Sequence, residues 1–137
     1  MFAKRAREQY GLEIHPGPFD LNSRPALIAE KFAESQGKGE AFHEAMMKAY
    51  WQEAQRIDDE EVLKKIAATV GLNTDNFSEI LKNPKYEAEV SADIALAEEY
   101  QLTGVPALVF ANRYLVMGAQ PYEVLQQVTE RVQAEGL

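Results

Sequence analysis

Two short apolar runs near the end of an otherwise helical sequence limit the folds open to this chain more than any other feature. The runs are Ala107–Ala111 and Tyr114–Met117, and Asn112-Arg113 between them can turn the chain. Together they predict a two-stranded hairpin. Because one hairpin is barely stable alone, it requires helices over it, further strands beside it, or both.

The remaining sequence has apolar residues at helical spacing. Helices are predicted at about 3–10, 24–36, 39–55, 59–70, 75–81, 84–101 and 121–132. Asp58 followed by Glu61 is an aspartate version of the capping box and predicts a helix start there. The predicted class is therefore α/β, mostly helical, with one hairpin and one final helix after about six helices.

Composition narrows the functional classes. The chain has 137 residues, the size of one ordinary domain, and a formal net charge of −8. An acidic chain repels nucleic-acid phosphates and anionic membrane surfaces, so neither partner is expected. The first residues contain no uninterrupted apolar run, and no later stretch is long enough to span a bilayer. A cytoplasmic protein is the resulting expectation.

The sequence contains no cysteine. It therefore has no thiol nucleophile, no thiolate ligand and no disulfide. His15 and His43 have no base, nucleophile or metal partner visible in the sequence. The acidic run Asp58–Glu61 suits a helix N-terminus better than a metal ion. Neither a metal site, a cofactor nor a catalytic residue is predicted.

The most informative segment is Thr103-Gly104-Val105-Pro106, directly before the first predicted strand. An X-Pro bond costs only about 0.5–1 kcal/mol to hold cis, so a fold can select that isomer. A proline at a strand entrance also leaves one backbone position unpaired. Two interpretations stay open for Pro106: a turn that directs the strand, or a wall of a binding site.

This segment and others resemble the DsbA superfamily, and within it the FrnE-like branch related to 2-hydroxychromene-2-carboxylate isomerases. The matching residues keep the order and approximate spacing of that family from about residue 3 to the C-terminus. They are Asn22-Ser23-Arg24, Gln36-Gly37-Lys38, Phe42, Ala49-Tyr50-Trp51, Asp58, Val62-Leu63, Gly71-Leu72, Glu89-Val90, Asp93, Gly104-Val105-Pro106, Phe110, Asn112, Tyr114 and Gly118-Ala119-Gln120.

The resemblance implies a truncated DsbA-like thioredoxin fold. Residues 1–21 would be a residual N-terminal helix and loop, 22–101 the helical insertion domain, and 102–137 the closing strand–strand–helix. The family's first strand, its helix with the Cys-x-x-Cys dithiol and its second strand have no counterpart in this sequence. The expected activity is that of a thiol–disulfide oxidoreductase, inactive here without a dithiol.

By the same resemblance, Gly104, Val105 and Pro106 would bind substrate, because the residue before the family's proline pairs with an extended peptide. Two alternatives remain open: a non-catalytic module that binds a peptide or ligand or serves in assembly, and a remnant of a glutathione-dependent isomerase. The strand starting at Ala107 would have one unpaired side, which predicts a homodimer through the exposed sheet edge.

Overall fold

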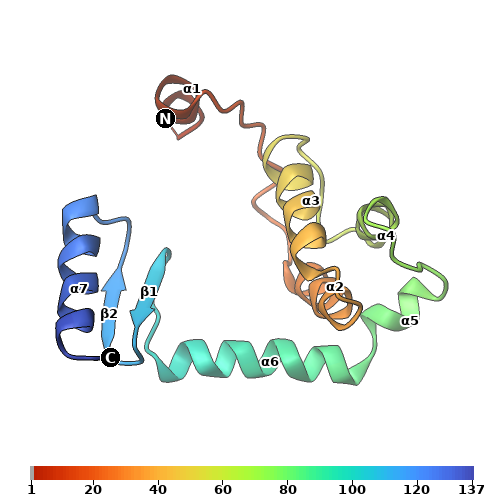
Figure 1. Ribbon diagram of the computed structural model, residues 1–137. Helices are drawn as coiled ribbons and strands as arrows, with labels where there is room; N and C mark the ends of the chain where they lie inside the picture. Colours follow the sequence, from red (N-terminus) through yellow and green to blue (C-terminus); the bar gives the residue numbers. More distant parts are fainter. Residues whose placement is uncertain (1) are drawn as a thin grey trace. The chain divides into compact units, whose positions relative to one another are not determined.

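A computed structural model describes residues 2–137, which form two compact units, one up to Ala92 and one from Asp93. Figure 1 shows the order of the elements along the chain. They are α1 (Phe2–Tyr10), α2 (Arg24–Ser35), α3 (Gly39–Trp51), α4 (Glu60–Thr69), α5 (Phe77–Leu81), α6 (Pro84–Glu99), β1 (Ala107–Phe110), β2 (Tyr114–Met117) and α7 (Tyr122–Ala134). The boundary between the units falls inside α6.

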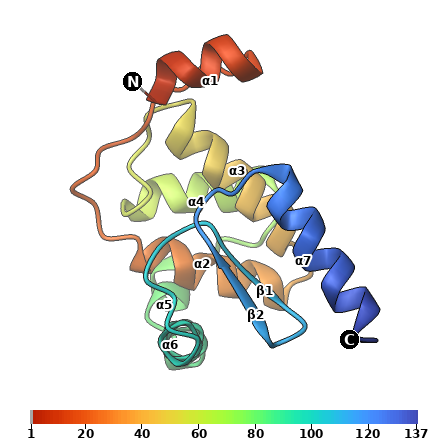
Figure 2. The ribbon, with the colours of Figure 1, turned by 90° about the vertical axis from the view of Figure 1, so that its left-hand side faces the viewer.

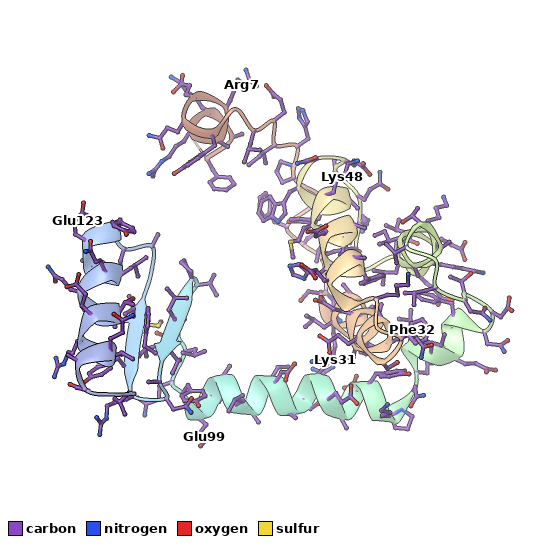
Figure 3. The ribbon with its side chains drawn as sticks, viewed as in Figure 1. Arg7, Lys31, Phe32, Lys48, Glu99 and Glu123 are labelled. Atoms are coloured by element: carbon purple, nitrogen blue, oxygen red, sulfur yellow. The ribbon has the colours of Figure 1, made fainter. Side chains whose placement is uncertain are left out.

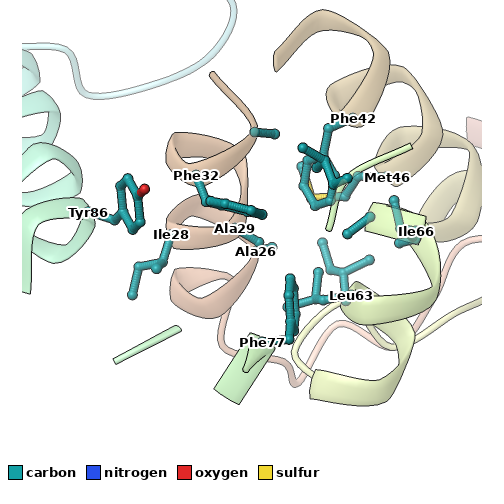
Figure 4. Close-up of a cluster of buried hydrophobic side chains, with 14 of the residues drawn as sticks. Ala26, Ile28, Ala29, Phe32, Phe42, Met46, Leu63, Ile66, Phe77 and Tyr86 are labelled. Carbon is teal, nitrogen blue, oxygen red and sulfur yellow. The ribbon is translucent and has the colours of Figure 1, made fainter. Parts of the chain in front are cut away.

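The first unit has a helical core. Its largest fully buried side chains are Phe42 of α3, Leu63 of α4 and Phe77 of α5, and Figure 4 shows them converging in one cluster. Burying a side chain of this size contributes about 1.5–3 kcal/mol relative to leaving it exposed. Residues up to Ala92 therefore contain the main hydrophobic core of the described chain.

Helix α2 lies between α6 and the pair α3 and α4 (Figure 4). Its Ala26 and Ala29 are buried toward α3 and α4, where small side chains allow a close approach. On the opposite side, the ring of Phe32 meets that of Tyr86 edge to face, with centroids 6.0 Å apart. The apolar side chains of α2 are therefore buried on two faces of the helix, not on one.

The cap of α4 differs by one residue from the sequence prediction. Asp59, not Asp58, is the N-cap, and its Oδ1 accepts hydrogen bonds from the backbone N–H of Glu61 at 2.8 Å and of Val62 at 3.3 Å. The predicted capping role of Asp58 is wrong because its carboxylate instead accepts a hydrogen bond from Arg56 Nη2 at 2.9 Å. Adjacent aspartates compete for one cap, and Asp58 is also engaged by the distant Asn22 N–H, which donates to its Oδ2 at 3.4 Å.

The second unit contains the predicted hairpin. β1 pairs antiparallel with β2 in the register Ala107↔Met117 to Phe110↔Tyr114. Ala111 and Asn112 close the turn with φ of 51° and 54°, the left-handed conformation that hairpin turns with the right twist require. Within residues 2–137, these two strands make up the whole sheet.

Helix α7 covers one face of the hairpin (Figure 2). Alternation along the strands places Leu108, Phe110, Tyr114 and Val116 on one face. The Arg131 guanidinium of α7 lies over the Tyr114 ring, 4.8 Å from its centroid, and Val116 is buried. The face of Leu108 and Val116 is therefore the one that α7 covers, and the face of Val109 and Leu115 is open.

A carboxylate joins the end of α7 to β2. Glu135 accepts hydrogen bonds from the Tyr114 hydroxyl at 2.7 Å, from Arg131 Nε at 3.1 Å and from Arg113 Nη1 at 3.3 Å. The Tyr114 hydrogen bond, followed by that of Arg131, holds the pKa of Glu135 below its ordinary value. Without these donors, an anion at the negative end of a helix is unfavourable.

The predicted class, α/β and mostly helical with a small hairpin, is confirmed. Across the described residues, no helix combines the length and the apolar character needed to cross a membrane. The boundaries predicted at residues 21/22 and 101/102 came from the resemblance and stay predictions.

A core substitution tests the helical unit. We expect Leu63→Ala, at a side chain with 0% exposure, to lower the free energy of unfolding by about 2–5 kcal/mol, because it leaves a cavity. The matched control is Leu27→Ala on α2, where Leu27 is 40% exposed, with an expected change within about 0.5 kcal/mol. Urea unfolding followed by circular dichroism measures both, and equal effects would contradict this account of the core.

Acid should weaken the link between α7 and β2. The folded-state pKa of Glu135 is lowered, so its stabilisation is fully present above the unfolded-state pKa of about 4.3 and is lost as pH falls through the folded value. We expect the protection factors of the β2 amides, which correct for the slower intrinsic exchange in acid, to fall below about pH 4. Glu135→Gln should remove most of that pH dependence, whereas Glu130→Gln on the same helix should preserve it.

Candidate functional site

The segment before β1 forms an exposed loop whose position is held by a single backbone contact. The Pro106 carbonyl accepts a hydrogen bond from the Gly118 N–H at 2.8 Å, just beyond the end of β2. Residues Thr103 to Pro106 are all exposed, and the Val105–Pro106 peptide bond is cis. The three residues predicted to bind substrate therefore lie together on the surface of the second unit.

The contact from Gly118 also decides which way the backbone of β1 points. Since the Pro106 carbonyl faces β2, alternation turns the N–H and C=O groups of Leu108 and Phe110 toward β2 as well. The groups of Ala107 and Val109 then point away from β2. We call this side of the strand, with the backbone groups of Ala107 and Val109, the outer edge of β1.

Val105 lies in the loop directly before Pro106, just outside β1. Its side chain is 92% exposed, and a cis peptide bond joins it to Pro106. The space beside Gly104 is open. A Cβ atom added to this residue would have Met117 Cε as its nearest heavy atom, 3.8 Å away. This surface can offer backbone hydrogen bonds to an extended chain, the mode by which strand addition binds peptides.

The loop itself has no acid–base or nucleophilic chemistry. Residues 102–112 contain no Asp, Glu, Lys, Arg, His or Cys. In the part of the chain that the structure describes, no group of three or more potential metal ligands comes together. The arrangement supports binding through main-chain groups and offers no titratable side chain for catalysis.

The two histidines lie apart from this loop in sequence and have local roles. His43 Nδ1 is 2.8 Å from Oε1 of Glu30, an exposed contact between α3 and α2. The backbone of His15 joins the loop after α1 to the end of α3, with its N–H 2.7 Å from the Trp51 carbonyl. Both histidines are exposed, His43 on a helix and His15 in a loop.

The motif Asn22-Ser23-Arg24 begins α2 and packs it against α6. The Asn22 Oδ1 accepts a hydrogen bond from the Arg24 N–H at 3.0 Å, whereas Ser23 makes no side-chain cap. The Arg24 guanidinium pairs with Glu87 and also donates to Ser91 Oγ at 2.8 Å. These polar groups are satisfied by one another, so the motif has a structural role in starting α2 and joining it to α6.

An apolar hollow of about 480 Å³ lies beside Trp51 in the first unit. Phe2 and Leu12 line it together with Met47, and the rings of Phe2 and Trp51 are 5.9 Å apart between centroids. Trp51 itself is partly buried. Because Phe2 and Trp51 are far apart in sequence, periodicity could not bring them together.

A family model described as the DSBA-like thioredoxin domain matches residues 3–130. Among curated proteins, the chain is 29% identical over 119 residues to the ClpXP adapter protein SpxH of Shouchella clausii. The alignment covers 81% of this chain and 40% of the adapter. The chain thus spans less than half the length of that relative.

Solved structures give the same family. A probable DsbA oxidoreductase of Streptomyces coelicolor superimposes with a TM-score of 0.78 and 28% identity, over 97% of this chain and 58% of that one. A thioredoxin-like oxidoreductase of Silicibacter pomeroyi gives a TM-score of 0.65 and 29% identity, over 85% of this chain and 64% of that one.

The family match covers both the helical unit and the hairpin with its preceding loop, so the resemblance inferred from the sequence is confirmed at the level of the superfamily. The solved structures that are similar to this chain are thiol–disulfide oxidoreductase-like proteins. The chain belongs to the family of DSBA-like thioredoxin domains.

Proposed function

We propose that this chain is the polypeptide-binding portion of a DsbA-type thiol–disulfide oxidoreductase, and that by itself it binds extended polypeptide without catalysing disulfide exchange. The observation that carries the proposal is the exposed Val105 at the end of the outer edge of β1, in a chain of this family that has no cysteine.

Binding would use the main chain of Gly104 and Val105. An extended peptide lying along this segment can exchange backbone hydrogen bonds with Val105, whatever its own sequence. Pro106 keeps this surface in shape, because its ring fixes its own φ and restricts Val105 to extended conformations. The absence of charged side chains in residues 102–112 suits a ligand recognised by its backbone and apolar side chains.

Disulfide exchange requires a thiolate that attacks a disulfide sulfur. No atom of this chain can form one, since none of its 137 residues is cysteine. The family's redox step would therefore need a dithiol supplied by other polypeptide sequence. The part of the reaction left to this chain is to hold and orient the substrate.

Insulin reduction provides a direct test of the missing chemistry. With dithiothreitol or reduced glutathione as the reductant, the purified chain should not accelerate insulin precipitation above the rate in buffer. A DsbA-type enzyme with its dithiol serves as the positive control. Reproducible catalysis by this chain would overturn the proposal, because no cysteine could account for it.

Peptide binding tests the role of the loop. The probe is a fluorescein-labelled insulin B chain with carboxymethylated cysteines, and fluorescence anisotropy measures its affinity. We expect saturable binding, and Pro106→Ala should weaken it by about tenfold, equivalent to about 1.4 kcal/mol, because Val105 loses its conformational restriction.

The matched control is Pro84→Ala, at an exposed proline in the first turn of α6. It should leave the affinity unchanged. Circular dichroism should show that both variants keep the helical content of the parent chain. Equal binding by Pro106→Ala and the parent would place the peptide elsewhere and contradict the proposed site.

A second candidate function is that of an adapter, favoured by the similarity to the ClpXP adapter protein SpxH. An adapter acts by binding, so it requires no thiol. Purified ClpXP immobilised on a sensor would bind this chain saturably if the adapter role applied. The absence of binding, together with peptide capture at the Val105 loop, would leave the oxidoreductase-derived function as the better account.

A further inference from the structure

The outer edge of β1 has hydrogen-bonding groups that no strand within residues 2–137 pairs with. Between the cis proline and the turn, the N–H and C=O groups of Ala107 and Val109 all point away from β2. Such a row of groups on a short apolar strand is a template for pairing with another strand.

The exposed fractions of the side chains also show that β1 is less covered than β2 on this face. Leu108 and Val116 lie opposite each other in the ladder and on the face that α7 covers. Val116 is 9% exposed, whereas Leu108 is 43% exposed. The exposed apolar surface on this face therefore includes the side chain of Leu108, in the middle of β1.

β1 is short, with four residues, but it lacks the other devices that usually prevent strand association. Natural edge strands are protected by short length, charged side chains, prolines or bulges. Here residues 107–111 contain neither charge nor proline, and β1 pairs with β2 in a continuous register. The acidic residues Glu99 and Glu123 of this unit lie on α6 and α7, as Figure 3 shows, and not on the strands.

We propose that β1 pairs antiparallel with β1 of a second copy of this chain, across a two-fold axis at Leu108. In this register Ala107 faces the partner's Val109 and Val109 faces the partner's Ala107. Both N–H and both C=O groups of the outer edge then form hydrogen bonds in each copy. The result is a continuous four-stranded sheet, which meets the need of a two-stranded hairpin for further strands.

Other registers use fewer of these groups. An axis at Val109 would oppose Ala107 to the partner's Ala111, which is in the turn with φ of 51°. An axis at Ala107 would oppose Val109 to the partner's Val105, which precedes the proline and lies outside the strand. Only the axis at Leu108 keeps every pair of the outer edge within β1.

The same register brings the exposed leucines together. Residue pairs on a two-fold axis of this kind are non-hydrogen-bonded, with Cα atoms about 4.5 Å apart, so Leu108 contacts the partner's Leu108. Because the axis is perpendicular to the sheet, both α7 helices lie on the same face, one on each side of the leucine pair. A second copy therefore covers the apolar side chain as well as the backbone.

An extended peptide could satisfy the same backbone groups, but a second copy removes two open edges at once and supplies the matching leucine. The two occupants also compete. With the axis at Leu108, the partner's Ala111 lies opposite Val105, where the proposed peptide would bind. Addition of the labelled insulin B chain should therefore shift the dimer toward monomers.

Sedimentation velocity of the 137-residue chain provides the test. We expect a concentration-dependent species with twice the monomer mass. Leu108→Lys should abolish it, because two ammonium groups would meet at the axis. The matched control is Leu115→Lys on β2, since Leu115 has the same 43% exposure but lies on the opposite face and away from the edge.

Charge pairing distinguishes this register from others. Leu108→Lys and Leu108→Glu chains should each be monomeric, and an equimolar mixture should restore the dimer, because residue 108 meets only residue 108 of the partner. Loss of the dimer in Leu115→Lys but not in Leu108→Lys would indicate association through the open sheet face, and would overturn the proposal.

Hydrogen exchange tests the parent chain without any substitution. Raising the protein concentration should slow exchange of the Ala107 and Val109 amides, whereas the Leu108 amide, already directed at β2, should change little. A chain that stays monomeric at high micromolar concentration, or equal slowing at all three amides, would contradict edge pairing. Neither readout depends on peptide binding, so failure of the proposed function would be recognised separately.

Discussion

The unpaired outer edge of β1 is the constraint on which the behaviour of the hairpin unit depends. Backbone N–H and C=O groups in a strand require partners, and within residues 2–137 only one side of β1 has them. A hairpin with one helix over one face buries little apolar surface, so Leu108, Val109 and Leu115 remain exposed. Whatever satisfies this edge, whether peptide or a second copy, also adds to the stability of the unit.

The helical unit has the opposite character. Phe42, Leu63 and Phe77 converge from three helices into one core, and α2 contributes buried residues to two interfaces. Its polar groups are satisfied by one another, as the pairing of Arg24 of α2 with Glu87 of α6 shows. This unit therefore has a core of its own, whereas the hairpin unit depends on contacts such as the Glu135 carboxylate with the Tyr114 hydroxyl.

The proposed function assigns binding and disulfide chemistry to different segments of the DSBA-like fold. The loop at Val105 and Pro106 has exposed main-chain groups beside a strand, and it is the surface proposed to hold a substrate. The absence of cysteine leaves the chain without the group that would react with that substrate. Under this proposal, binding would not depend on the presence of the dithiol.

The sequence predicts the order and type of the elements, because helical and alternating apolar spacing are local properties that the folded chain keeps. It also determined the absence of a thiol, and Gly104-Val105-Pro106 was sufficient to locate the candidate binding loop. The superfamily was inferable because many matching residues keep their order over the whole chain.

The choice between residues that look equivalent in the sequence depends on contacts in the folded chain. Asp59 caps α4, whereas Asp58 accepts hydrogen bonds from Arg56 and from the N–H of Asn22, which is distant in sequence. The side of β1 that stays open follows from one hydrogen bond, from the Gly118 N–H to the Pro106 carbonyl, which sets the alternation of the strand. The hollow beside Trp51 likewise joins residues distant in sequence. In each case the deciding contact joins residues whose proximity no local pattern encodes.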